Sequence, residues 1–146
     1  MHRRTSLMAL FTGAAAVLTG RRTAAALAGK MHRAVFDLTA EAPERWDAAL
    51  RNVENLRLAF GPEHVEARVV VHGKAYPLLQ KTNTAMGERL RALQEGGVRL
   101  CLCRNTMRRF NVTQESLFPF VETVDAAVAE LVRQQEAGFA YLKVGV

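Results

Sequence analysis

The feature that most constrains the fold is an alternation between short apolar runs and longer amphipathic segments. The apolar, β-favouring runs cover residues 34–38, 65–71, 98–103, 120–124 and 140–144. Most of the segments between them repeat apolar residues at steps of three and four, which is the period of an amphipathic helix. Strands that alternate with helices form βαβ units, and such units build a parallel sheet with helices on both faces. The sequence therefore predicts an α/β fold with a mostly parallel sheet of about five strands.

Residues typical of helix starts and ends define three long helices in the intervening segments. These cover residues 43–60, 84–95 and 126–135. Thr84 is the expected N-cap of the second helix, because its hydroxyl can accept a hydrogen bond from a free N–H of the first turn. In the third helix, the spacing of Val128, Leu131 and Val132 predicts that all three face the core. A short helix over residues 105–110 is expected directly after the third strand.

Length and composition fit one domain with a single core. The chain has 146 residues, of which 49% are hydrophobic and 23% are charged. Its net charge of +6 and pI of about 10 raise the question of a nucleic-acid partner. However, four of the 20 basic residues and none of the 14 acidic ones lie in residues 1–28, so the remainder carries 16 basic against 14 acidic residues. That remainder has no basic stripe interleaved with aromatic residues, and we expect no nucleic-acid partner.

Residues 1–28 have the features of an export signal, and residues 29–146 are the predicted single domain. Arg3 and Arg4 give a charged start, residues 7–20 form a short apolar stretch, and residues 26–28 offer a small-residue cleavage site. The paired arginines are similar to those of twin-arginine signals, which predicts a periplasmic protein. Two alternatives stay open. The leader could remain uncleaved and anchor the protein to a membrane, or translation could start at Met31 and give a cytoplasmic domain.

Residues 97–109 combine two thiols with a change from strand to helix. Apolar residues alternate with Cys101 and Cys103 along the strand, and a polar segment follows at once. This pattern predicts a buried strand that places Cys103 at the start of a helix. Asn105 or Thr106 is expected to accept hydrogen bonds from the free N–H groups of the first helical turn.

Three arginines follow the second thiol and bring positive charge to the same part of the chain. They are Arg104, Arg108 and Arg109. A helix N-terminus and nearby cations favour the ionised form of a thiol, so a lowered pKa is expected for Cys103. Arg104 and Arg108 are candidates for binding an anion, whereas a solvated helix face is the favoured interpretation for Arg109.

Polar residues follow the first three predicted strands. Thr39 follows the first strand, His72 with Gly73 and Lys74 follows the second, and Cys103 ends the third. Ligands of parallel sheets bind beyond the carboxyl ends of the strands, so these residues line one crevice if the three strands are neighbours. His72 is a candidate general base or anion ligand; a structural, hydrogen-bonded histidine is the favoured alternative.

Several kinds of site have no support in the sequence. Cys101 and Cys103 share one face of a strand, but extended geometry separates their Cα atoms by roughly 6.5 Å, near the upper limit for a disulfide. A metal site built from His72 and both cysteines lacks a fourth ligand at a recognisable spacing, so no metal is assigned. No G-x-G-x-x-G motif follows the first strand and no Walker loop occurs, so no cofactor is predicted.

Four segments, in the same order between about residues 34 and 142, resemble the DsrE/DsrF-like family of small sulfur-relay proteins. They are residues 97–107 with Cys-x-Asn-Thr-Met at 103–107, residues 46–56 with Trp46 and Asn-Val-x-Asn-Leu, residues 69–73 with Val-Val-Val-His-Gly, and residues 130–141 with Glu-Leu-Val-Arg and Gly-Phe-Ala-Tyr. The resemblance implies a Rossmann-like three-layer sandwich that assembles into homotrimers or hexamers. It also implies a sulfur donor protein, an acceptor protein or a small sulfur anion as partner.

Position and resemblance together favour a sulfur carrier, at most a sulfurtransferase-like protein. The Cys103 thiolate would attack a sulfane sulfur donor, hold the sulfur as a persulfide and pass it on, with Cys101 as a possible resolving thiol. The candidate anion-binding residues are His72, Gly73, Arg104, Asn105, Thr106 and Arg108.

Three other interpretations stay open. Cys103 could be a small buried apolar residue, which is the commoner role of a free cysteine. The protein could instead be a non-catalytic, homo-oligomeric module that binds a small anion or a partner. The pair Cys101 and Cys103 could also serve as a redox or metal sensor.

Overall fold

The computed structural model describes residues 29–146, and the predicted export signal and cleavage site of residues 1–28 lie outside the described residues. Five strands are found: β1 (His32–Leu38), β2 (Val65–Val71), β3 (Arg99–Cys103), β4 (Glu122–Val124) and β5 (Ala140–Val144). The α-helices are α2 (Pro43–Phe60), α3 (Thr84–Glu95), α4 (Arg104–Phe110) and α5 (Ala127–Glu136). Short 3₁₀ segments are η1 (Pro62–His64), η2 (Gly73–Leu79) and η3 (Gln114–Ser116).

All five strands belong to one parallel sheet with the order β4-β3-β2-β1-β5. The register pairs Leu38 with Val71 and Val71 with Leu102, so β1, β2 and β3 end at nearly the same level. The predicted α/β fold with about five strands is confirmed. The three strands whose ends carry polar residues are also direct neighbours, as the predicted crevice requires.

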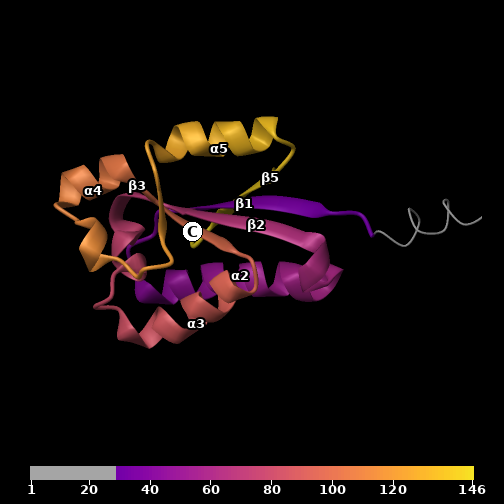
Figure 1. Cartoon of the computed structure of the whole chain (residues 1–146), viewed down its shortest axis with the longest axis horizontal. Helices are drawn as coiled ribbons and strands as arrows, with labels where there is room; N and C mark the ends of the chain where they lie inside the picture. Colours follow the sequence, from indigo (N-terminus) through magenta and orange to yellow (C-terminus); the bar gives the residue numbers. More distant parts are fainter. Residues whose placement is uncertain (1–28) are drawn as a thin grey trace, which may run out of the picture.

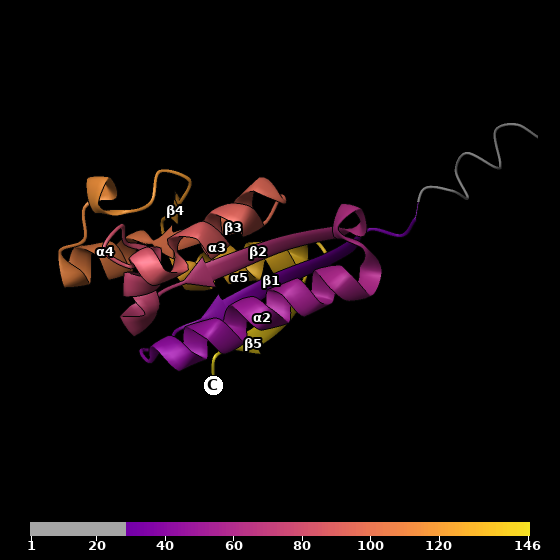
Figure 2. The same ribbon diagram turned by 90° about the horizontal axis from the view of Figure 1, so that it is seen from below.

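The sheet is the middle layer of three. Helices α2 and α3 cover one face, and α5 covers the other (Figures 1 and 2). Side chains alternate between the two faces along each strand, so each strand contributes to both cores. Along β1, Phe36 and Leu38 join the larger core on the side of α2, while Val35 packs toward α5 with Val70 and Leu131.

The face of helix α5 that packs against the sheet is not the predicted one. Leu131 is 7% exposed as expected, but Val128 is 68% exposed and Val132 is 52% exposed. Two other residues of α5 face the sheet with Leu131. They are Ala127, four residues before it, and Glu130, directly before it. Glu130 takes an inward position because it meets a buried arginine, Arg68, at 2.8 Å.

Two local predictions are also wrong. Helix α3 begins at Thr84 itself, so the N-cap position belongs to Asn83, whose side-chain amide donates to the carbonyl of Leu78 at 3.2 Å instead of capping the helix. Strand β4 is shorter than predicted, because the stacked rings of Phe118 and Phe120 lie in a turn before the strand. Among the described residues, no helix has both the length and the apolar character needed to cross a membrane.

Candidate functional site

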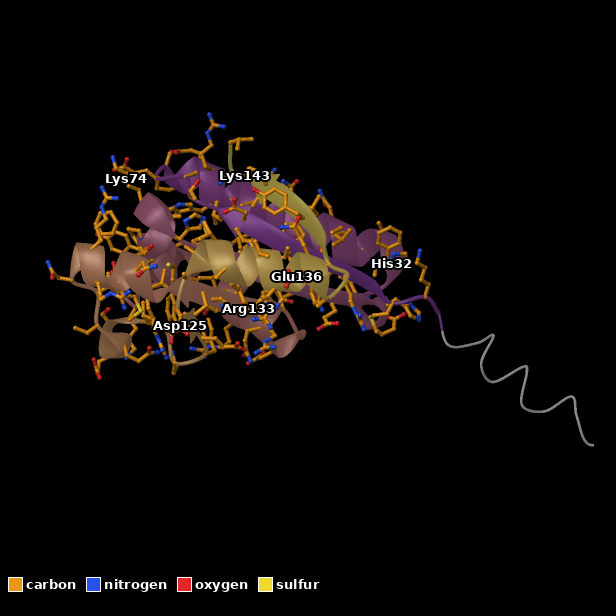
Figure 3. All side chains as sticks on the ribbon, turned by 90° about the horizontal axis from the view of Figure 1, so that it is seen from above. His32, Lys74, Asp125, Arg133, Glu136 and Lys143 are labelled. Atoms are coloured by element: carbon orange, nitrogen blue, oxygen red, sulfur yellow. The ribbon has the colours of Figure 1, made fainter. Side chains whose placement is uncertain are left out.

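The carboxyl ends of β1, β2 and β3 meet at one end of the sheet. Figure 3 shows His32, at the start of β1, at the opposite end of the sheet from Lys74, which follows β2. The register that pairs Val71 with Leu102 brings the next two positions, His72 and Cys103, opposite each other. Because Val70 and Cys103 both belong to the core beneath α5, His72 and Cys103 lie on the α5 face of the sheet.

A pocket of about 240 Å³ opens at this place. It is lined by His72, Gly73, Cys103, Asn105, Thr106, Arg109, Ala126, Ala127 and Val128. The structure thus brings together five of the residues predicted for the site: His72, Gly73, Cys103, Asn105 and Thr106. It does not place Arg104 or Arg108 in the pocket, and it adds Arg109 together with the start of α5.

Cys103 lies at the boundary between β3 and α4 and contacts a second helix. It is only 4% exposed, and it is one of the residues that line the pocket. The backbone N–H of Ala127, the first residue of α5, donates to Cys103 Sγ at 3.3 Å. Negative charge is stabilised at a helix N-terminus, so this contact suits a sulfur that becomes anionic during a reaction.

The side chains that were expected to cap α4 have other partners. Cys103 is the N-cap residue of α4, and no side chain hydrogen-bonds to the free N–H groups there. Thr106 Oγ1 instead accepts a hydrogen bond from the backbone N–H of Gly73 at 2.9 Å, which ties α4 to the end of β2. Gly73 has a φ of 59°, a left-handed value that favours glycine at this turn. Asn105 Oδ1 accepts from the guanidinium of Arg108.

The three arginines of the segment differ in their surroundings. Arg104 donates to Asp125 at 2.8 Å and to Thr123 at 3.2 Å. Arg108 interacts with Asn105 of its own helix. Arg109, for which a solvated position was favoured, is the arginine that lines the pocket. Of the three arginines expected near Cys103, Arg109 lines this pocket, whereas Arg104 and Arg108 do not.

A buried carboxylate, Asp37, is hydrogen-bonded to His72. It was not among the predicted site residues. Asp37 is 7% exposed, and its Oδ1 lies 2.8 Å from His72 Nε2. Its Oδ2 accepts from the Tyr141 hydroxyl at 2.7 Å and from Lys143 Nζ at 3.3 Å. Burial alone would raise its pKa, but the hydrogen bonds from His72 and Tyr141 and the charge of Lys143 together lower that pKa to about 2. One acid inside the apolar run of residues 34–38 was the signal for this network, because a buried carboxylate needs partners.

Cys101 precedes Cys103 by two residues on β3 and lies in a closed environment. It is fully buried, and Arg68 Nη1 approaches its sulfur at 3.8 Å while donating to Glu130 at 2.8 Å. Burial raises the pKa of the Cys101 thiol to about 11. Both cysteines are free thiols. Within residues 29–146 there is no group of three or more His, Cys, Asp or Glu side chains that could hold a metal ion.

Comparisons with known proteins agree with this architecture. A solved structure described as a protein of unknown function, MTH1491, from Methanobacterium thermoautotrophicum has a TM-score of 0.72 and 28% sequence identity, covering 77% of this chain and 98% of that one. The ychN protein from E. coli has a TM-score of 0.66 and 17% identity, covering 77% and 99% of the two chains, and this likeness concerns the fold. A search of curated proteins found no match. The model of the DsrE/DsrF-like family matches residues 33–144, and the chain belongs to this family.

Proposed function

We propose that this protein is a sulfur carrier that holds sulfane sulfur as a persulfide on Cys103. The observation that carries the proposal is the position of Cys103, which lines a pocket and whose Sγ accepts a hydrogen bond from the N–H that begins α5. A nucleophilic thiol needs an accessible path for its substrate and a setting that tolerates negative charge. The pocket and the N–H of Ala127 support this role for Cys103, whereas the fully buried Cys101 does not line this pocket.

The proposed reaction needs only a thiol and a sulfane sulfur donor. With thiosulfate as donor, Cys103 Sγ attacks the outer sulfur and forms a new S–S bond. The bond between the two thiosulfate sulfurs breaks, and its electron pair leaves with sulfite. The product is Cys103–S–S⁻, and an acceptor thiolate or sulfite can remove the terminal sulfur by the same type of displacement.

The pocket suits a small anion. Its volume of about 240 Å³ accommodates thiosulfate or the end of a persulfide chain rather than a nucleotide. Arg109 supplies a cation in the wall, and the N-terminus of α5 adds the positive end of a helix dipole. These groups would attract the donor and would also stabilise the departing sulfite.

The second candidate function is a non-catalytic module that binds a small anion or a partner through this end of the sheet. The observation that favours it is the burial of Cys103, which exposes only 4% of the residue to solvent. In that case the pocket binds an anion without any covalent bond to sulfur. The two functions differ in whether the thiol gains mass.

The test is the intact mass of the purified protein after incubation with thiosulfate or polysulfide. We expect a gain of about one sulfur atom that a reducing thiol reverses. The matched variants are Cys103→Ser, which should gain nothing, and Cys101→Ser, which should gain sulfur as the natural protein does. A folded protein that takes up no sulfur would rule out the carrier and leave the binding module.

A further inference from the structure

We propose that His72 is the general base that takes the proton of the Cys103 thiol, and that Asp37 is the positioning residue that fixes the imidazole for this task. The proposal deepens the proposed function, since it concerns the same thiol. It rests on three observations that are independent of sulfur chemistry: the register of β2 and β3, the hydrogen bond between His72 and Asp37, and the shared pocket wall.

The sheet places His72 and Cys103 next to each other. His72 and Cys103 follow the paired residues Val71 and Leu102 on neighbouring parallel strands, so their backbones lie about 5 Å apart. Both side chains are on the α5 face and both line the pocket. Among the described residues the His72 ring has no hydrogen bond to Cys103 Sγ, so the proposed proton transfer passes through one water molecule in the shared pocket.

Asp37 determines which ring nitrogen of His72 is available. The carboxylate Oδ1 lies 2.8 Å from Nε2, so Nε2–H donates to Asp37 and Nδ1 carries the free electron pair. A neutral imidazole held in this tautomer can accept one proton, at Nδ1. The imidazolium that results keeps its hydrogen bond to the carboxylate, which stabilises the new positive charge.

The groups around the dyad support this assignment. Tyr141 and Lys143, both from β5, hold the other oxygen of Asp37, so the carboxylate stays ionised and fixed in place. Arg109 of α4 and Cys103 line the same pocket as His72. The hydrogen bond to the buried Asp37 carboxylate therefore determines the orientation of the ring.

The proton and electron balance of the loading step is then complete. Cys103 gives its proton to His72 Nδ1, and the electron pair of the S–H bond stays on sulfur and attacks the outer sulfur of thiosulfate. Sulfite leaves with the electron pair of the broken S–S bond and takes the proton from His72. The overall change is Cys103–SH plus thiosulfate giving Cys103–S–S⁻ plus hydrogen sulfite, without an external oxidant or reductant.

The test measures the reactivity of Cys103 itself, not sulfur transfer. The full-length protein is treated with iodoacetamide at pH 7 and at pH 10, and fragment ions of the tryptic peptide 100–104 assign the modification to Cys103. For His72→Gln and Asp37→Asn we expect a rate about tenfold lower at pH 7, because a thiol that loses its base ionises less. At pH 10, where most thiols ionise without help, we expect the rates to differ by less than about twofold. The matched control is His64→Gln, since His64 lies outside the pocket.

Each of the following outcomes either supports or overturns the proposal. A pH-dependent loss in His72→Gln that free imidazole restores in His72→Ala would support a general base. Equal losses at both pH values, or no loss at all, would overturn it, and circular dichroism would show whether a variant has unfolded. If His72→Gln unfolds, Asp37→Asn decides on the same criterion. Failure of the carrier function appears separately: Cys103 would then show the pH-dependent reactivity but would take up no sulfur.

Discussion

Cys101 and Cys103 lie two residues apart on one face of one strand, beneath the same helix, yet their surroundings differ. Cys101 is enclosed by the sheet, Arg68 and Glu130, and burial raises the pKa of its thiol to about 11. Cys103 is almost as buried, with 4% exposed, but it receives the first N–H of α5 and lines a pocket. Two thiols that are almost equally buried therefore have different surroundings: one is enclosed, and the other lines a pocket.

The difference comes from the position of each residue along the strand. In the middle of a parallel sheet, covering helices close both faces, so a thiol there behaves as a small apolar side chain. At the carboxyl end, strands give way to loops and helix starts, which leaves room for a ligand and supplies free N–H groups. The closed position of Cys101 and the position of Cys103 at the end of the strand are only two residues apart, roughly 6.5 Å.

The largest expected effect is a difference in alkylation rate between the two thiols. Because reactivity follows the thiolate fraction, iodoacetamide at pH 7 should modify Cys103 at least about a hundredfold faster than Cys101 in the natural protein. Mass spectrometry of peptide 100–104 at successive times measures both rates. Equal rates would remove the distinction between the two positions.

The next effect concerns the ion pair that encloses Cys101. Arg68→Leu should lower the free energy of unfolding by about 3 kcal/mol, because it leaves the Glu130 carboxylate buried without its main partner. Arg133→Leu is the matched control: Arg133 contacts the same carboxylate at 3.6 Å but is half exposed, so a loss below about 1 kcal/mol is expected. Urea denaturation of both variants compares them, and equal losses would show that the buried pair does not stabilise this region.

Asp37 gives a smaller, pH-dependent effect near Cys103. Its pKa in the folded protein is about 2, below the ordinary value of 3.8, so the folded form binds fewer protons than the unfolded form between these values. The contribution of Asp37 to stability is complete above about pH 4 and is lost as the pH falls through 2. Against Asp37→Asn, the natural protein should be more stable by about 2 kcal/mol at pH 7, with the difference shrinking in acid. Denaturation at several pH values measures this, and a constant difference would contradict it.

The smallest expected effect is a difference in sulfur-loading rate between variants of two arginines of α4. Arg109 lines the pocket, whereas Arg104 is paired with Asp125 at the surface. Arg109→Gln should slow sulfur loading from thiosulfate about fivefold, and the effect should weaken at high salt because the interaction is electrostatic. For Arg104→Gln we expect a change below about twofold. A larger effect of Arg104 would move the anion site to the other side of α4.

The alternation of apolar runs and helical periods was enough to predict the five strands and the long helices, because both signals are local. The same signal failed for α5, where Glu130 faces the sheet and Val128 faces solvent. That reversal depends on Arg68, which is 62 residues away along the chain, and no local period encodes such a pairing.

The candidate site could be predicted in part for the same reason. Residues at strand ends, including His72 and Cys103, follow from the topology of any parallel sheet. Asp37 was missed although it interrupts an apolar run, because its partners Tyr141 and Lys143 lie more than 100 residues away. The choice of Arg109 over its neighbours depends on the rotation of a short helix, which the sequence does not specify.

The most direct measurement of the central claim is the location of sulfur after loading. The natural protein is incubated with thiosulfate, the persulfide is trapped with an alkylating reagent, and fragment ions of peptide 100–104 assign the extra sulfur to one thiol. We expect the sulfur on Cys103 and an unmodified Cys101. Sulfur on Cys101, or none on a folded protein, would contradict it.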